Sequence, residues 1–316
     1  MRSTSRFACL TLAGLLASIV CLPSAAQWID RGLHDHTLVE IERSDAHLYA
    51  ATHSGIFRQP LDRPEDPWTA AGFDGQPILA IAVTGADTIL AAVDTRDGGA
   101  PVASLHRSTD GGENWVSIGE HLSDEAPDLR VESMAVHPQR SQTVFLGGAQ
   151  VIVRSDDLGE TWRPVWGDFG DIGMGVHFFA FDPNDTDVIR SGGETAAFGP
   201  FTLLSTDGGD SWAMHTLSLG GDNAVYSTVI HSADSDVVLA GTEGSVLRST
   251  DGGDRWEVVL EPEEYPYFHG LVESEVLDTR MYAAGWRRVD TQDLIVYITS
   301  DAGTSWAERP LGASGR

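Results

Sequence analysis

The chain has no lysine and only two cysteines. Both cysteines, Cys9 and Cys21, lie in the first 26 residues, so the rest of the chain excludes disulfides and thiolate chemistry. All 20 basic residues are arginines, and they face 47 Asp and Glu residues, which gives a net charge of −27. A protein with so few basic residues lacks the positive surface that neutralises phosphates, so we predict no nucleic-acid binding. We interpret the excess of acid as a solvated surface.

Long hydrophobic runs are also lacking, except at the N-terminus. The run from Phe7 to Leu22 follows Arg2 and Arg6 and precedes small residues up to Ala26. This order predicts a secretory signal peptide over residues 1–26 and a periplasmic or secreted protein. A lipoprotein signal using Cys21 is the alternative, but the preceding residue is bulkier than such signals prefer. No later run is long enough to span a bilayer, so we expect no membrane insertion after cleavage.

One motif, Ser/Thr-x-Asp-x-Gly-x-x-Trp, recurs five times, and we call it the box. The Trp-to-Trp steps are 47, 50, 44 and 50 residues, and a degraded copy ends at Trp68. Self-similarity at such a period indicates a repeat architecture. The boxes occupy residues 108–115, 155–162, 205–212, 249–256 and 299–306, with their aspartates at Asp110, Asp157, Asp207, Asp251 and Asp301.

The chemistry of the box is that of a turn between two strands. Ser, Thr and Asp side chains hydrogen-bond to turn amides, and Gly adopts backbone conformations that a Cβ resists. The Trp begins the next strand and buries a large ring between neighbouring sheets. We therefore interpret the five aspartates as structural rather than catalytic.

Three further strand signals precede each box, for example 131–136, 143–146 and 151–154 before the box at 155–162. Four short strands in each unit of 40–50 residues are typical of a propeller blade. We therefore predict an all-β, six-bladed β-propeller of four-stranded antiparallel blades, occupying 27–316 as a single domain. The segment Trp28–Leu33 resembles an extra strand that helps to close the ring. The predicted blades are about 34–75, 76–120, 130–170, 174–218, 223–262 and 266–311.

The box resembles the Asp box of the BNR repeat. This repeat is found in sialidases, sortilin-type receptor domains, xyloglucan-degrading hydrolases and photosystem II assembly factors. The resemblance implies a propeller over nearly the whole mature chain. It does not imply one activity, because the same fold serves enzymes and binding proteins.

Blade topology places the boxes, as turns between the third and fourth strands, at one end of every blade. Variable loops at the other end more often carry function. The longest connections there, 93–103, 192–200 and 285–293, present polar and aromatic side chains. We expect this loop end to bind a protein or a carbohydrate. The candidate binding residues are Asp94, Arg96, Glu132, Glu194, Tyr226, Trp286, Arg287, Arg288 and Asp290.

Three histidines occupy similar places where the first strand of a blade begins: His36, His177 and His269. Glu132 and Tyr226 fall at about the same repeat position. Repeat symmetry would bring these side chains together at the channel mouth, where histidines with a carboxylate could bind Zn, Fe or Cu. The alternatives are polar lining of a wet channel and packing between blades, and the sequence names no cofactor.

No catalytic constellation stands out. Phe57-Arg58-Gln59-Pro60 resembles a sialidase segment, but Arg58 is in repeat register with Arg107, Arg154 and Arg248. No triad elbow, phosphate loop or HExxH motif is present. We therefore favour a non-catalytic binding protein, such as an assembly factor or scaffold. A glycoside hydrolase or polysaccharide lyase is the first alternative, and a metal-centred propeller enzyme using the axial histidines is the second.

Overall fold

The computed structural model describes residue 33 and residues 36–95, 103–119, 122, 130–149, 151–167, 175–195, 199–217, 224–274, 279–287 and 293–309. These residues form two compact units, divided between Phe169 and Gly170. The predicted signal peptide lies outside the described residues, and of the predicted strand Trp28–Leu33 only Leu33 is described. Within the described ranges, no helix is long and apolar enough to cross a membrane.

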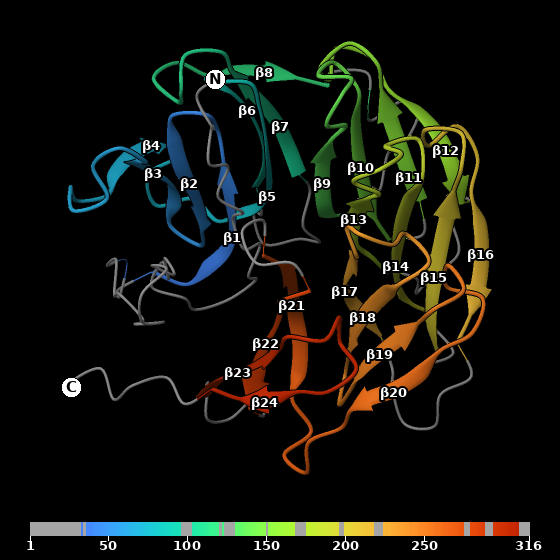
Figure 1. The fold of residues 1–316 in the computed structure, drawn as a ribbon. Coiled ribbons are helices and arrows are strands. Elements are labelled where there is room, and N and C mark those ends of the chain that lie inside the picture. The colour runs from blue at the N-terminus through green and yellow to red at the C-terminus, as the bar shows by residue number, and fades with distance from the viewer. Residues whose placement is uncertain are drawn as a thin grey trace, which may run out of the picture. The chain divides into compact units, whose positions relative to one another are not determined.

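The N-terminal unit contains three four-stranded antiparallel sheets (Figure 1). We call each sheet a blade and name its strands a to d in chain order. Blade 1 is β1 (Leu38–Arg43), β2 (His47–Thr52), β3 (Gly55–Pro60) and β4 (Thr69–Gly72); blade 2 is β5 (Ile78–Thr84), β6 (Thr88–Asp94), β7 (Ala103–Ser108) and β8 (Val116–Ile118); blade 3 is β9 (Val131–Val136), β10 (Val144–Gly148), β11 (Val151–Ser155) and β12 (Arg163–Gly167).

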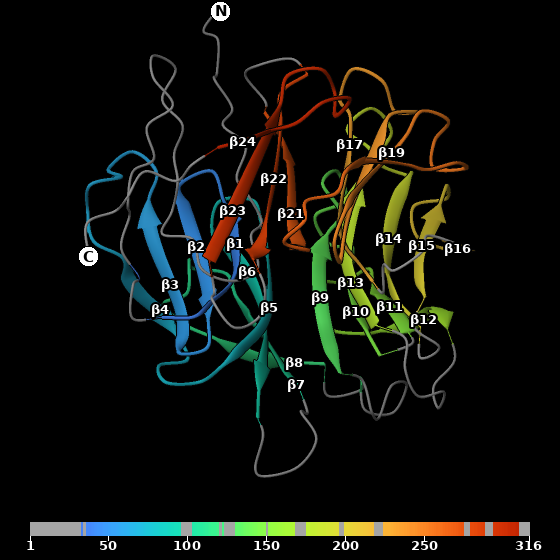
Figure 2. The ribbon, with the colours of Figure 1, turned by 90° about the horizontal axis from the view of Figure 1, so that it is seen from below.

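The C-terminal unit contains three more sheets of the same order, and Figure 2 shows β14, β15 and β16 of one sheet side by side. The predicted all-β fold of six four-stranded antiparallel propeller blades is confirmed. Blade 4 is β13 (Gly175–Phe181), β14 (Ile189–Glu194), β15 (Pro200–Ser205) and β16 (Ala213–Thr216); blade 5 is β17 (Val225–Ile230), β18 (Val238–Thr242), β19 (Val246–Ser249) and β20 (Glu257–Leu260); blade 6 is β21 (Tyr267–Glu273), β22 (Met281–Arg287), β23 (Asp293–Thr299) and β24 (Ala307–Glu308).

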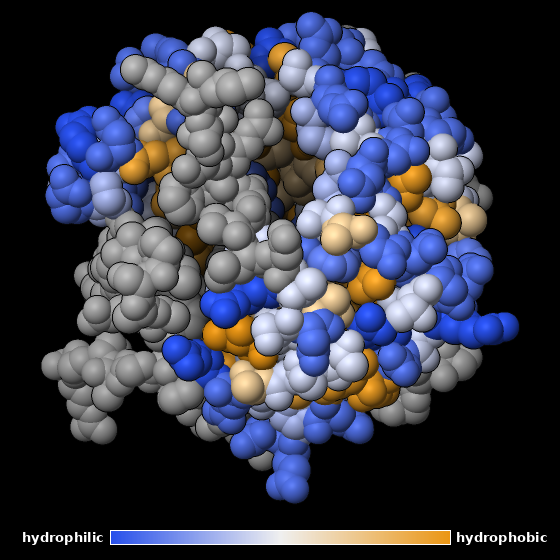
Figure 3. Space-filling model, in the orientation of Figure 1, coloured by the Kyte–Doolittle hydropathy of each residue, from blue (hydrophilic) through white to orange (hydrophobic). Residues whose placement is uncertain are grey.

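Burial changes from strand to strand within a blade. All five residues of β10 and of β18 are buried, whereas all four residues of β16 are exposed. Strands buried on both faces are continuous apolar runs, which is why β6, β10 and β18 are rich in Val, Leu, Ala and Gly. Figure 3 shows mainly polar side chains on the visible surface of the described residues, with apolar ones in small groups.

Each box forms a self-contained hydrogen-bonded turn. In the box of blade 3, Ser155 Oγ accepts from Gly159 N (2.8 Å) and donates to Asp157 Oδ1 (2.7 Å). The same oxygen of Asp157 accepts from Thr161 N (2.8 Å), and Trp162 Nε1 donates to Gly159 O (3.0 Å). The other four boxes repeat the Ser/Thr and Asp contacts. The aspartates therefore hold turns together, as predicted from their chemistry.

Within each unit, arginines join boxes to the preceding blade. Arg58 lies at the end of β3, where its Nη1 donates to Gly111 O in the box of blade 2 (2.8 Å). Arg107 in β7 and Arg248 in β19 make the same contact with the boxes of blades 3 and 6, at 3.0 and 2.9 Å. In all three cases the acceptor is the carbonyl directly after the box aspartate. Arg58 is thus a repeat position at the box end, and its role is structural.

Blade 4 makes the same link with a different strand. Leu204 takes the place of the strand c arginine in β15, and its cross-strand partner in β14 is Arg190. Arg190 Nη2 donates to Gly252 O, the equivalent carbonyl in the box of blade 5. Cross-strand partners project from the same face of a sheet, so either position can reach the next box.

Candidate functional site

Every blade has a β-bulge near the start of strand a, where one extra residue interrupts the pairing with strand b. Bulges re-aim side chains and are frequent next to functional sites. Blades 2 to 6 thus each have two kinds of repeated feature, the box turn at one end and the strand a bulge at the other, loop end. The bulge positions, in chain order, carry Val39, Leu79, Glu132, His177, Tyr226 and His269; in blade 6 the bulge also includes Phe268.

The register confirms four of the five predicted equivalences and corrects the fifth. Glu132, His177, Tyr226 and His269 are equivalent, but His36 lies three residues before the bulge position of its own blade. The equivalent residue in blade 1 is Val39. The ring of His36 instead packs on Phe57 of the same blade, with the ring centroids 4.5 Å apart. Sequence spacing failed here because blade 1 has only a degraded box, so the motif did not fix the register of its strands.

In the C-terminal unit the bulge residues form one aromatic cluster. The ring centroid of Tyr226 lies 5.5 Å from that of His177 and 4.2 Å from that of His269. Tyr267 extends the cluster, since its ring is stacked with His269 at 6.3 Å and lies 6.0 Å from Tyr226. Blades 4, 5 and 6 each contribute to this group, which we call the loop-end cluster: His177, Tyr226, Tyr267 and His269.

Two carboxylates border the loop-end cluster. Glu194 ends β14, and Glu243 follows β18 and forms a β-bridge with Tyr267. Burial and the nearby Glu243 charge raise the pKa of Glu194. A hydrogen bond with Glu243 and partial burial raise the pKa of Tyr267, while burial and both carboxylates raise that of Tyr226. Both phenols therefore remain protonated at neutral pH.

The histidines of the cluster are uncharged at neutral pH. Burial lowers the pKa of His177 to about 4, and burial together with the nearby His177 lowers that of His269 to about 4. Neutral imidazoles suit metal binding, but within the described ranges no group of three or more His, Cys, Asp or Glu side chains is placed to hold a metal ion. The negative charge at the loop-end cluster therefore comes from the two bordering carboxylates, Glu194 and Glu243.

Backbone features make room for these side chains. A Cβ on Gly193, opposite the bulge in β14, would lie 1.8 Å from Gly175 O and 3.1 Å from His177 Cδ2. A Cβ on Gly244 would lie 2.4 Å from the ring of Tyr265. Tyr265 itself has φ of 54° and is 38% exposed. A bulky residue in this backbone region is strained, and such strain is concentrated at functional sites.

The predicted loop residues need several corrections. Asp94, Glu194, Trp286 and Arg287 belong to strands, because pairing in blades 2, 4 and 6 continues to Asp94↔Ala103, Glu194↔Pro200 and Arg287↔Asp293. Asp94 is moreover buried, at 6% exposure. Glu132 lies at the bulge of blade 3, in the N-terminal unit. The predicted Arg96, Arg288 and Asp290 lie outside the described residues.

Glu243 was missed, although the repeat contained a signal for it. Glu194, Glu243, Asp94 and Trp286 all stand five residues after the strand b residue that pairs with a box Ser or Thr. Aligning the blades on the box would have singled out Glu243 beside Glu194. Tyr267 was missed because its contact with the cluster depends on the bulge of blade 6.

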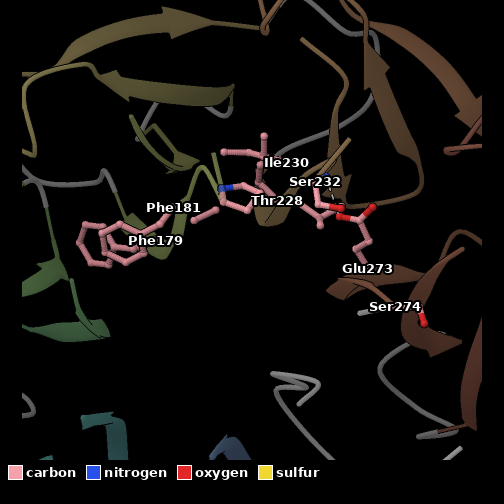
Figure 4. A pocket seen from close by; sticks show the side chains of 10 residues that line it. Phe179, Phe181, Thr228, Ile230, Ser232, Glu273 and Ser274 are labelled. Carbon is pink, nitrogen blue, oxygen red and sulfur yellow. Dashed lines mark hydrogen bonds between the residues drawn. The ribbon is translucent and has the colours of Figure 1, made fainter. Parts of the chain in front are cut away.

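A second feature of the C-terminal unit is a pocket of about 320 Å³ at the other end of the three strands a (Figure 4). Phe179 and Phe181 of β13 border it on one side, with their rings turned away from Thr228, and Glu273 and Ser274 border it on the other. Thr228, Ile230 and Ser232 lie between them, with Ala180, Pro183 and Val229 completing the lining. The sequence analysis singled out none of these residues.

No protein-family model matches the chain. It is 24% identical over 276 residues to a xyloglucanase of Paenibacillus sp., covering 72% of this chain and 26% of the relative. The GH74 xyloglucanase of Xanthomonas campestris has a similar structure, with a TM-score of 0.63, 20% identity and coverage of 83% and 43% of the two chains. YCF48 bound to D1 peptide is similar with a TM-score of 0.56, 14% identity and coverage of 83% and 78%.

These similarities establish the propeller fold. The chain spans about a quarter of the length of the curated relatives that it matches. The matched solved structures include glycoside hydrolases and a peptide-bound protein. Function therefore has to be argued from the site.

Proposed function

We infer that this chain is an exported, non-catalytic β-propeller that binds a segment of a partner protein at the loop end of blades 4 to 6. The observation that carries this proposal is the contiguous loop-end cluster, which three blades build from equivalent bulge positions. The five boxes support assignment to the Asp-box repeats, and residues 1–26 support export to the periplasm or beyond. An assembly factor or scaffold fits this description.

The chemistry of the cluster favours a ligand with a positive charge. Its imidazoles are neutral, its phenols are protonated, and Glu194 and Glu243 supply negative charge. Aromatic faces beside carboxylates attract Arg and Lys side chains through cation–π and ionic interactions. The net charge of −27 adds long-range attraction for such a segment.

One of the matched solved structures supports a binding role. YCF48 bound to D1 peptide shares the fold over 78% of its own length.

The test uses labelled decapeptides that alternate Gly with Arg, Gln or Glu, and measures binding by fluorescence anisotropy. We expect the Arg peptide to bind at least about tenfold more tightly than the Gln peptide. Tyr226→Ala should weaken Arg-peptide binding about tenfold, since aromatic and cation–π contacts contribute about 0.5–2 kcal/mol each. The matched control, Tyr282→Ala in β22, should leave binding unchanged.

Both tyrosine variants keep the charge of the chain, so non-specific attraction between the acidic protein and a basic peptide is the same in each. Equal affinity of the wild type and Tyr226→Ala would rule out the loop-end cluster as the binding site. Equal affinity for the Arg and Gln peptides would rule out cation recognition.

A glycoside hydrolase is the second candidate, favoured by the two carboxylates beside the aromatic cluster. The raised pKa of Glu194 suits a general acid, and Glu243 would act as base or nucleophile. Incubation with xyloglucan should then release reducing ends, and Glu194→Gln should abolish the release. If the wild type releases no more than Glu194→Gln, this candidate is eliminated.

A further inference from the structure

An exposed tyrosine with an unusual backbone borders the loop-end cluster. Tyr265 lies in the connection between β20 and β21, has φ of 54° and is 38% exposed. A bulky residue in the left-handed region is strained, so the surrounding structure has to hold it there. Tyr265 N donates to Pro262 O at 3.2 Å. On the other side, Gly244 N donates to Pro266 O at 2.9 Å. The ring of Tyr265 is therefore held in place at the loop end.

Gly244 supports one face of this ring. A Cβ on Gly244 would lie 2.4, 2.7 and 2.9 Å from Cε2, Cδ2 and Cζ of Tyr265. Such similar distances to three neighbouring ring atoms place Gly244 over the ring face and not at its edge. Only glycine permits this approach, and its φ of 101° is one that other residues rarely adopt. The exposure of Tyr265 is thus on the opposite face and the edges of the ring.

Two carboxylates lie close to Tyr265. Glu243 directly precedes the glycine that supports the ring, and its charge raises the pKa of Glu194. Both carboxylates and the phenol of Tyr265 contribute to the raised pKa of Tyr226, so these groups share one neighbourhood. Glu194 and Glu243 are only partly buried, so a ligand at the surface can reach them.

These carboxylates have no positive partner. In the described part of the chain, neither Glu194 nor Glu243 forms an ion pair with an arginine. Two neighbouring negative charges repel each other, and a bound cation would remove that repulsion. An exposed ring face beside two such carboxylates suits a cation that is itself flat.

We propose that the positively charged residue of the partner segment is arginine, which stacks on Tyr265 and donates hydrogen bonds to Glu194 and Glu243. This assignment rests on the proposed function, because it names the side chain that the same site recognises. A guanidinium is planar, has five N–H donors and is more weakly hydrated than an ammonium, so it can stack and reach two carboxylates at once. The lysine ammonium is a compact, strongly hydrated charge that cannot stack in this way.

The experiment measures binding of labelled decapeptides that alternate Gly with Arg, Lys or Gln, by fluorescence anisotropy. The Arg and Lys peptides carry the same charge, so the long-range attraction of the acidic chain is equal for both. We expect the Arg peptide to bind at least about fivefold more tightly than the Lys peptide, the difference that one stacked, hydrogen-bonded guanidinium supplies. The Lys peptide should bind more tightly than the Gln peptide.

Variants then locate the contact. Tyr265→Asn removes the ring and introduces a residue that tolerates positive φ. It should bring the affinities for the Arg and Lys peptides to within about twofold of each other, mainly by weakening the Arg peptide. Gly244→Ala displaces the ring and should act in the same direction; if it fails to fold, Tyr265→Asn still decides. The matched control, Met214→Ala on β16, removes another exposed side chain and should change neither affinity.

The arginine assignment and the proposed function fail in different ways. Equal affinities for the Arg and Lys peptides, both tighter than for the Gln peptide and both weakened by Tyr226→Ala, would overturn the arginine assignment and leave the proposed function standing. An unchanged Arg-to-Lys ratio in Tyr265→Asn would overturn the stacking on Tyr265. Equal binding of all three peptides would overturn both proposals.

Discussion

The box turns and the strand a bulges are both repeated around the blades, yet they differ in what varies between copies. Five boxes keep the same Ser/Thr, Asp, Gly and Trp and the same hydrogen bonds. The bulges keep their backbone irregularity but carry Val, Leu, Glu, His, Tyr and His. A position that keeps the same side chain in every repeat stabilises the fold. A position that keeps only its backbone conformation can carry a different side chain in each blade, and those side chains can bind a ligand.

The largest effect that tests this difference is expected from Trp162→Ala. The ring is 6% exposed, lies in the core of the N-terminal unit and donates to Gly159 O. Its loss should lower the free energy of unfolding by about 3–5 kcal/mol, measured by urea denaturation. His177→Ala, at a bulge, should cost less than half as much. Similar losses in both variants would contradict the division between structural boxes and variable bulges.

An intermediate effect is expected from the arginine that blade 4 places in a different strand. Arg190→Leu removes a charged, largely buried hydrogen bond to Gly252 O and should cost about 1.5–3 kcal/mol in unfolding free energy. Adding Leu204→Arg moves the arginine to the strand used by blades 1, 2 and 5. The double variant should regain at least half of the loss, as measured in the same denaturation experiment.

If Leu204→Arg gives no recovery, the two cross-strand positions are not interchangeable. The hydrogen bond to the next box would then require the arginine to lie in a particular strand, and not only to be close enough to the box carbonyl.

The smallest effect concerns the pH dependence of stability, in which the box aspartates and two carboxyl groups of β1 act in opposite directions. Side-chain hydrogen bonds from Asn114, Ser211 and Ser305 lower the pKa of Asp110, Asp207 and Asp301 from 3.8 to about 2. Their stabilising contribution is therefore complete above about pH 4 and is lost as the pH falls through 2.

In β1, burial raises the pKa of Glu42 from 4.5 to about 7, and burial and Glu42 raise the pKa of Glu40. A raised carboxyl pKa means that the folded state binds the proton more tightly, so stability increases as the pH falls from about 7 to 4.5. We expect Tm to be highest near pH 4–5, with a rise of about 2–4 °C from pH 8, because these half-buried groups are partly screened.

Glu42→Gln is the variant that separates the contribution of β1 from that of the boxes. It should raise Tm at pH 8 and flatten the profile between pH 5 and 8, while the loss of stability below pH 4 stays unchanged. A Tm that falls steadily from pH 8 to pH 5 in the wild type would contradict the raised pKa of Glu42.

Much of the fold could be predicted because its signals are local. A box is eight residues long, and its hydrogen bonds join residues two and four positions apart, so the motif alone specifies the turn. The candidate site was predictable only in part. Equivalent positions were found for His177, Tyr226 and His269, but His36 was misaligned because blade 1 has only a degraded box to fix its register. The ends of the long strands were missed because pairing extended into segments that look like loops.

The sequence by itself determined the blade number, the strand order and the chemistry of the boxes. Each of these depends on interactions within one repeat, and the repeat recurs along the chain. Only the tertiary structure decided that Tyr226 lies between two histidines, that Glu194 and Glu243 border them, and that Phe181 and Glu273 line one pocket. Tyr226 is 49 and 43 positions from the two histidines, and Phe181 is 92 positions from Glu273. Their meeting depends on bulges, register and blade packing, which no local pattern encodes.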